Sequence, residues 1–237
     1  MNWDVMIEMI PKLAEGALLT IELLVLSAIM GLIIAVPMAI ARVSKSFWIN
    51  MWPRAYCYFF RGTPLLVQLF LVYYGLGQFE AVRESFAWPV LRDAYWCALI
   101  TFSLHTAAYI SEILRGAMQA VPGGEIEAAR SVGMNSKQIY GRIILPRAFR
   151  IALPAYGNEL ILMLKASALA STITLLDLTG MARTISAKNY LPIETFVTAG
   201  AFYLIITYGL TLIIQFMEVY FHPDRKEPKS ASTNFVV

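Results

Sequence analysis

The chain has 237 residues, of which 58% are hydrophobic and 15% are charged, and its mean hydropathy is +0.61. Soluble domains have about 25% charged residues, so this composition excludes an ordinary soluble protein. The net charge of +3 comes from basic residues spread over several segments, which argues against a nucleic-acid-binding surface. Cys57 and Cys97 lie in or beside apolar stretches, and we expect buried apolar side chains there rather than a disulfide or a metal site.

Several apolar stretches are long enough to cross a membrane, which takes about 20 helical residues. We therefore predict an all-α polytopic membrane protein with one transmembrane domain over residues 1–220. In chain order, the five predicted spans cover residues 17–41, 55–76, 95–118, 149–176 and 196–216. Residues 1–16 are acidic and lack the basic region of a cleavable signal peptide. Residues 221–237 are predicted to form a cytoplasmic tail.

Basic residues predict how these spans are oriented, because lysine and arginine are enriched in cytoplasmic loops. The link after the first span is basic and has no acids, whereas the N-terminal segment is acidic. The link after the third span and its flanks carry the largest group of basic residues, which are Arg115, Arg130, Lys137, Arg142, Arg147 and Arg150. We therefore expect the N-terminus outside the cell and the C-terminus in the cytoplasm.

Residues 122–146, between the third and fourth spans, form a polar segment in an apolar chain. After a proline and two glycines, residues 125–132 contain good helix formers with acids at the start. Gly133 ends this helix, and Asn135 can cap a second helix over residues 137–144. The residues alone leave two interpretations open, a solvated helical loop or a surface that another protein contacts.

The spacing inside this segment resembles the EAA motif of ABC-importer permeases. The matching positions are Glu127-Ala128-Ala129, Gly133 after three residues, Ile143 after nine more, and Leu145-Pro146 after one. The resemblance implies a coupling helix that docks on an ATP-binding subunit, with Glu127, Ala128, Ala129 and Gly133 at the contact. By similarity, ATP-driven closure of that subunit would move this segment and switch the pore between outward- and inward-facing states.

Three longer stretches resemble permeases for polar amino acids, the histidine/glutamine permease group. They are RGTPLLVQLFLVYYGLG (61–77), YISEILRGAMQAVPGGEIEAA (109–129) and RIALPAYGNELILMLKASALAS (150–171). The similarity is greatest to the histidine or arginine/ornithine branch. It implies the type I importer permease fold, the bacterial inner membrane, and basic amino acids such as arginine, ornithine, histidine or lysine as substrates. Glutamine or glutamate import is the alternative, followed by an ATP-independent transporter or channel subunit.

The resemblance also implies partners. These are a second homologous permease subunit, ATP-binding ABC subunits and a periplasmic amino-acid-binding protein, all at a membrane with lipid around the chain. The sequence has no glycine-rich phosphate-binding loop followed by lysine and serine or threonine, so ATP hydrolysis is expected in the partner subunits. We predict a non-catalytic subunit that needs no cofactor and no metal.

Ionisable residues inside a span are costly and usually mark paired or functional sites. Arg61 in the second span and Glu112 in the third lie at similar depths from the cytoplasmic side. We predict that Glu112 pairs with Arg61, or with Arg115 on its own helix, as a gating or structural pair. His105 lies on the face of Glu112 and is more typical of a helix–helix hydrogen bond than of a metal ligand.

The fourth span carries the predicted substrate contacts. A cationic amino acid needs a carboxylate to offset the desolvation of its charge, and Glu159 is well placed to supply it beside Asn158. Ser167 and Glu112 complete the predicted substrate-binding set, while an alternative role for Glu159 is to neutralise Lys165 or a partner residue. Many family members have an acid directly after this lysine, where this chain has an alanine, so the second permease is expected to hold more of the ligand.

Overall fold

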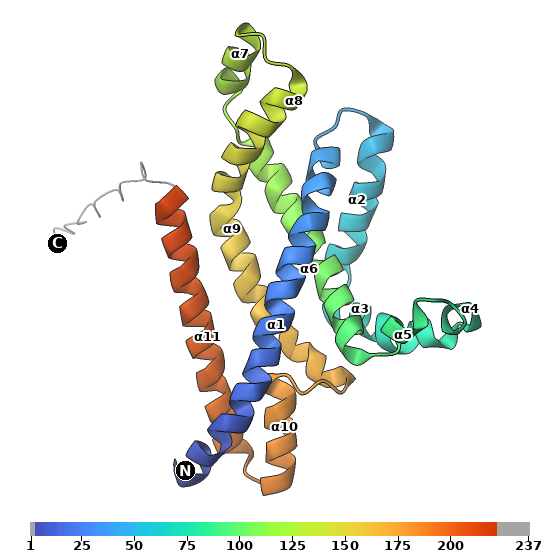
Figure 1. Ribbon diagram of the computed structural model, residues 1–237, viewed down its shortest axis with the longest axis vertical. Coiled ribbons are helices and arrows are strands. Elements are labelled where there is room, and N and C mark those ends of the chain that lie inside the picture. Colours follow the sequence, from blue (N-terminus) through green and yellow to red (C-terminus); the bar gives the residue numbers. More distant parts are fainter. Residues whose placement is uncertain (1–2, 222–237) are drawn as a thin grey trace, which may run out of the picture.

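The computed structural model describes residues 3–221, and every regular element in this range is helical (Figure 1). Three single helices are long and apolar enough to cross a membrane: α1 (Trp3–Arg42), α6 (Ala94–Gln119) and α11 (Pro192–Phe221). They correspond to the first, third and fifth predicted spans, although α1 begins 14 residues before the predicted start at residue 17. Of the predicted tail, only Phe221 falls inside the described residues.

The second predicted span is not one straight helix. It consists of α2 (Phe47–Gly62) and α3 (Leu65–Phe70), which continues through η1 (Leu71–Gly75) and η2 (Leu76–Gln78), and the two parts meet at 103°. Thr63 at the break has extended backbone angles, φ −113° and ψ 143°. The next residue is Pro64, which disfavours a helical conformation in the residue before it and lacks a backbone N–H. The short helices α4 (Glu80–Arg83) and α5 (Trp88–Leu91) then project to one side of the bundle.

The fourth predicted span is also broken. The chain forms α9 (Leu145–Ala166) and the 3-10 helix η4 (Ser167–Ile173), and after a bend of 50° it continues beyond the predicted end as α10 (Leu178–Asn189). Fully buried Asp177 caps α10, because its carboxylate accepts hydrogen bonds from the backbone N–H groups of Gly180 and Thr179 at 3.1 and 3.3 Å. The predicted span at 149–176 therefore ends at a change of direction that its apolar composition does not reveal.

Close packing of α1 fixes this break. A Cβ atom at Gly16 would lie 2.9 Å from the carbonyl oxygen of Asp177, so only glycine allows α1 to approach the start of α10. One turn later, the Thr20 hydroxyl donates to the Gly16 carbonyl and accepts from the backbone N–H of Leu178, both at 3.0 Å. These contacts satisfy polar groups that would otherwise be unpaired at the break.

The two ends of the bundle differ (Figure 1). The N-terminus and α10 lie at one end. The α1–α2 turn, the C-terminal end of α11, and the helices α7 (Gly123–Ser131) and α8 (Ser136–Ile139) lie toward the opposite end. The two most basic links of the sequence therefore lie at the same end of the molecule, as the charge pattern predicts.

Candidate functional site

The α7–α8 hairpin begins with a helix whose end requires glycine. Gly133 has φ +80°, a left-handed conformation that other residues rarely adopt. Its N–H donates to the Arg130 carbonyl at 3.0 Å, and the N–H of Met134 donates to the Ala129 carbonyl at 3.1 Å. These two bonds form a Schellman motif that satisfies the last carbonyl groups of α7. Gly133 therefore fixes the angle at which the chain leaves α7.

The second helix of the hairpin is continuous with α9. Asn135 caps α8 in a capping box, in which its side chain accepts from the Gln138 N–H while the Gln138 side chain accepts from the Asn135 N–H. The chain then passes through the π-helical turn η3 (Tyr140–Ile144) directly into α9. The predicted end of this helix before Pro146 is wrong, because proline is tolerated in the first turn of α9. The second helix of the hairpin and α9 therefore form one continuous helical segment.

Between α7 and the start of α9 lies a groove of about 570 Å³, called here the hairpin groove. Ala128, Ala129 and Ile143 contribute small or apolar surface to it. Its basic side chains are Arg142, Arg147 and Arg150, and its acid is Glu125, which is 3.5 Å from Arg147. Of the other predicted docking residues, Glu127 and Gly133 are exposed beside the groove and do not line it.

Glu112 lies in an ion cluster that differs from the predicted pair. Its carboxylate accepts from Arg42 of α1 at 2.7 Å and from the Nε of Arg115 at 2.8 Å, with a second, shorter contact to the Arg115 Nη2. The predicted pairing with Arg115 is confirmed, and the predicted pairing with Arg61 is wrong. Two guanidinium groups occupy its carboxylate in this conformation, and the role of Glu112 as a substrate contact stays a prediction.

Replacing Glu112 with alanine is expected to destabilise the end of the bundle that carries the hairpin. Arg42 and Arg115 would lose their counter-ion. Because only 13% and 27% of these two side chains are exposed, we expect the loss to cost about 3 kcal/mol of folding free energy. The melting temperature of the detergent-purified complex measures the effect. Glu80→Ala, at an exposed glutamate, is the control and should change nothing. Equal melting temperatures for the two variants would contradict a structural role of the cluster.

At the break of the second span, the Gln68 side chain joins α2, α3 and α6. Its Nε2 atom lies 2.8 Å from the Phe60 carbonyl, 3.0 Å from the Thr63 carbonyl and 2.7 Å from the Thr63 hydroxyl. Its Oε1 atom lies 3.1 Å from Nδ1 of His105. Since an amide oxygen can only accept, Nδ1 carries the hydrogen. The prediction that His105 makes a helix–helix hydrogen bond is confirmed.

The predicted substrate residues of α9 have different surroundings. Glu159 is 8% exposed, and its carboxylate makes no hydrogen bond or ion pair within residues 3–221. Asn158 and Lys165 are exposed. Ser167 is fully buried and donates its hydroxyl to the Leu164 carbonyl of the preceding turn at 2.8 Å, and its role as a substrate contact stays a prediction. The pairing of Glu159 with Lys165, one of the two alternatives, is absent from the described part of the chain.

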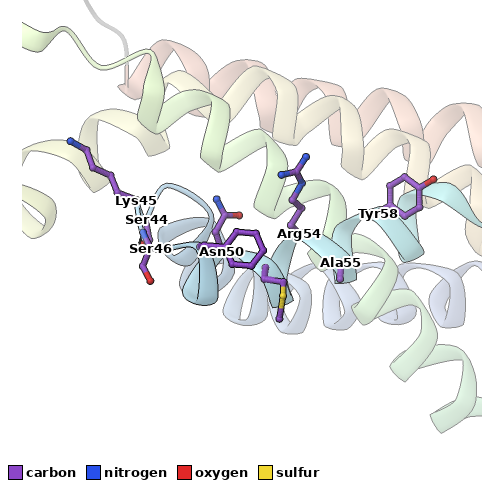
Figure 2. Close-up of a pocket in the computed structure, with 9 residues that line it drawn as sticks. Ser44, Lys45, Ser46, Asn50, Arg54, Ala55 and Tyr58 are labelled. Atoms are coloured by element: carbon purple, nitrogen blue, oxygen red, sulfur yellow. Dashed lines mark hydrogen bonds between the residues drawn. The ribbon is translucent and has the colours of Figure 1, made fainter.

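A second groove, of about 510 Å³, follows the α1–α2 turn and one face of α2 (Figure 2). Lys45 and Arg54 are its basic residues, and Figure 2 shows Asn50 and Arg54 directed to the same side of α2. The Asn50 amide donates to the Arg42 carbonyl at 3.1 Å and so caps the end of α1. None of the predicted substrate- or ATPase-binding residues lines this groove.

Sequence reasoning missed two important polar residues, Gln68 and Asp177. Both occur next to a signal for a helix break, which could have identified them. Gln68 follows Pro64 by four residues, and Asp177 precedes the helix-starting run Leu178-Thr179-Gly180. A polar side chain beside such a break inside a span is expected to satisfy the freed backbone groups.

The chain that carries the hairpin and its groove matches a known protein family. Residues 10–227 match the family model described as "Binding-protein-dependent transport system inner membrane component". The chain belongs to this family. It is an amino-acid ABC-transporter permease, and the family implies ATP-binding subunits and a substrate-binding protein as partners.

Three curated relatives illustrate the similarity. The permease is 45% identical to the octopine transport system permease protein OccM of Rhizobium radiobacter, over 90% of this chain and 87% of the relative. It is 42% identical to the nopaline transport system permease protein NocM of Agrobacterium fabrum, over 99% and 100%. It is 45% identical to the histidine/lysine/arginine/ornithine transport system permease protein HisM of Escherichia coli K12, over 82% of each chain.

Solved structures confirm the fold. A crystal structure of an amino acid ABC transporter with histidines matches with a TM-score of 0.82 and 32% identity, over 93% of the permease and 99% of the matched chain. An inward-facing MetNI methionine ABC transporter matches with a TM-score of 0.75 and 18% identity, over 90% and 98%, which supports the fold alone. The prediction of a type I ABC-importer permease is consistent with both. The five predicted spans agree with the structure if each bent helix pair counts as one span.

Proposed function

We propose that the permease carries basic amino acids through the membrane pore of an ATP-driven importer. The observation that supports this most is Glu159, a buried carboxylate without an ion-pair partner in the described chain. An unpaired buried carboxylate is costly, and a cation that arrives with the substrate offsets that cost. Asn158, beside it, is available as a hydrogen-bonding group. Arginine, ornithine, histidine and lysine are the proposed substrates, consistent with the name of the E. coli relative.

Opines are the second candidate substrates. The permeases for octopine and nopaline are 45% and 42% identical to this chain, as similar as the permease for basic amino acids. Competition for uptake separates the candidates, with unlabelled octopine, nopaline and L-glutamine tested against labelled L-arginine in the reconstituted complex. Inhibition by the opines at lower concentration than by L-arginine itself would make an opine the substrate. Inhibition by L-glutamine alone would favour import of neutral polar amino acids.

The hairpin is proposed to couple ATP hydrolysis by partner subunits to transport. Its groove offers small apolar surface flanked by arginines, a surface suited to an acidic or polar partner helix. Because α8, η3 and α9 follow one another without a break, displacement of the hairpin would move the helix that carries Glu159. We place the hairpin and C-terminus in the cytoplasm and the N-terminus in the periplasm of the bacterial inner membrane. A second, homologous permease would complete the pore.

Replacing Glu159 with glutamine is expected to lower uptake of L-arginine at least tenfold and to change uptake of L-glutamine far less. The reason is that the substitution keeps the side-chain shape and removes only the negative charge. Uptake is measured in proteoliposomes with the ATP-binding subunits, the binding protein and internal ATP. Glu80→Gln, at an exposed site, is the matched control. An equal loss for both substrates would indicate a structural role, and uptake without ATP would refute the importer mechanism.

A further inference from the structure

A well-fixed aromatic ring lies where α2 approaches α6. The Tyr109 ring on α6 lies against the His105 ring, with centroids 4.9 Å apart. His105 is held in turn by the hydrogen bond from its Nδ1 to Gln68 at the helix break. Through His105, Gln68 of α3 therefore helps to fix the position of the Tyr109 ring face. Such a face attracts a cation through the ring quadrupole.

In this structure the cation on that face is the chain's own. The guanidinium carbon of Arg61 lies 5.3 Å from the centroid of the Tyr109 ring. Gln68 positions this part of α2, because its amide binds the carbonyl of Phe60, the residue before Arg61. Within the described chain Arg61 forms no ion pair within 4.0 Å, in contrast to Arg42 and Arg115. Arg61 is exposed, and its side chain can leave the Tyr109 ring without breaking a salt bridge.

Arg61 also acts on Glu159, a buried carboxylate of α9. Arg61 and Glu159 attract each other electrostatically, although no ion pair joins them within 4.0 Å. An aromatic face and a carboxylate that both attract the same cation are groups that bind a guanidinium or ammonium ion. The three residues come from α2, α6 and α9, so the cluster depends on how these helices pack.

We propose that Arg61 is a tethered occupant of the cation site formed by Tyr109 and Glu159. Its charge offsets part of the Glu159 charge in the empty site, and the cationic side chain of a substrate displaces it. This proposal rests on the proposed role of Glu159 in binding basic substrates. With a tethered competitor, the apparent affinity for substrate equals the intrinsic affinity multiplied by the fraction of time that the site is free. If Arg61 fills the site for nine-tenths of the time, its removal tightens binding of a cationic substrate about tenfold.

The first test is equilibrium binding of labelled L-arginine to the complete, purified membrane complex in nanodiscs. Arg61→Gln is expected to lower the dissociation constant about tenfold. Arg54→Gln, seven residues earlier on α2 and outside this cluster, should leave it unchanged. Unchanged or weaker binding by Arg61→Gln would overturn the proposal. Glu159→Gln distinguishes the proposed binding of basic substrates at Glu159 from the proposed occupancy by Arg61. If this variant binds L-arginine normally, the Glu159 site itself is refuted. Weakening by Glu159→Gln without tightening by Arg61→Gln refutes only the tethered occupant.

A second test uses the unmodified protein and does not depend on the folding of a variant. Phenylglyoxal modifies accessible arginine side chains, and peptide mass spectrometry reports the modified positions. Saturating L-lysine is expected to increase modification of Arg61 severalfold, because the substrate displaces its guanidinium from the ring. Arg54 serves as the internal control and should react equally with and without L-lysine. An unchanged rate of Arg61 modification in the presence of L-lysine would overturn the proposal.

Discussion

Replacing Gly133 with valine is expected to abolish ATP-driven uptake and to release the ATP-binding subunits from the permease. Gly133 has φ +80°, and a side chain in this conformation costs about 1–2 kcal/mol, more for a β-branched residue. The Schellman bonds at the end of α7 would break, and α7 would no longer meet α8 at the angle that forms the hairpin groove. Co-purification of the ATP-binding subunits with the tagged permease, together with uptake in proteoliposomes, measures both effects.

Gly124→Val is the matched control for this experiment. Gly124 lies in the first turn of α7, has no left-handed φ, and has open space where a Cβ would be placed. It should retain both subunit binding and most of the uptake. Glu127→Lys tests the motif separately, because Glu127 is exposed and its replacement leaves the hairpin fold intact. Normal co-purification and normal uptake by both Gly133→Val and Glu127→Lys would refute the docking role of the hairpin.

Replacing Gln68 with leucine is expected to be strongly destabilising. The Gln68 side chain is 3% exposed and satisfies carbonyl groups of Phe60 and Thr63 as well as His105. Leucine would leave these part-buried groups without their partner, at about 1–3 kcal/mol for each buried group. We expect a total loss of about 3–5 kcal/mol, since partial relaxation makes such costs less than additive. The melting temperature of the detergent-purified complex should fall by many degrees.

Gln78→Leu provides the control, because Gln78 is exposed and makes one hydrogen bond, to the Tyr74 carbonyl at 3.2 Å. Its replacement should leave the melting temperature nearly unchanged. Gln68→Glu keeps the oxygen that accepts from His105 and loses the amide donor. It should therefore also destabilise the break in α2–α3. A melting temperature of Gln68→Leu equal to that of Gln78→Leu would show that Gln68 does not hold the break.

Hairpin geometry was predictable because its determinants are local. Gly133 ends α7, and Asn135 caps α8 through groups within three residues of it, as the residue types indicate. The prediction failed at Pro146, since proline tolerates the first turn of a helix and the chain continues from η3 into α9. Because of that continuity the hairpin is joined directly to α9, which the sequence pattern did not indicate.

Charge partners were less predictable. Residue counting placed Arg61 and Glu112 at similar depths, which is wrong, because α2 begins at Phe47, earlier than predicted. Arg61 lies 14 residues from that start, beside the break, whereas Glu112 lies 7 residues from the end of α6. The direction of each side chain around its helix depends on how the helices pack, and Glu112 faces Arg42 of α1 rather than Arg61. The same limit applies to Ser167, which lies on a small polar stripe in the sequence but faces the core.

The sequence by itself determined the class of this protein, its membrane-crossing segments and its family motif. These properties depend on composition, on apolar length and on local caps, all of which act over a few neighbouring residues. Tertiary structure alone decided where two spans break, which arginines hold Glu112, and that Arg61 lies over the Tyr109 ring. These contacts join residues far apart in the chain. Their geometry is set by close helix packing, as at Gly16 against Asp177, which no local pattern specifies.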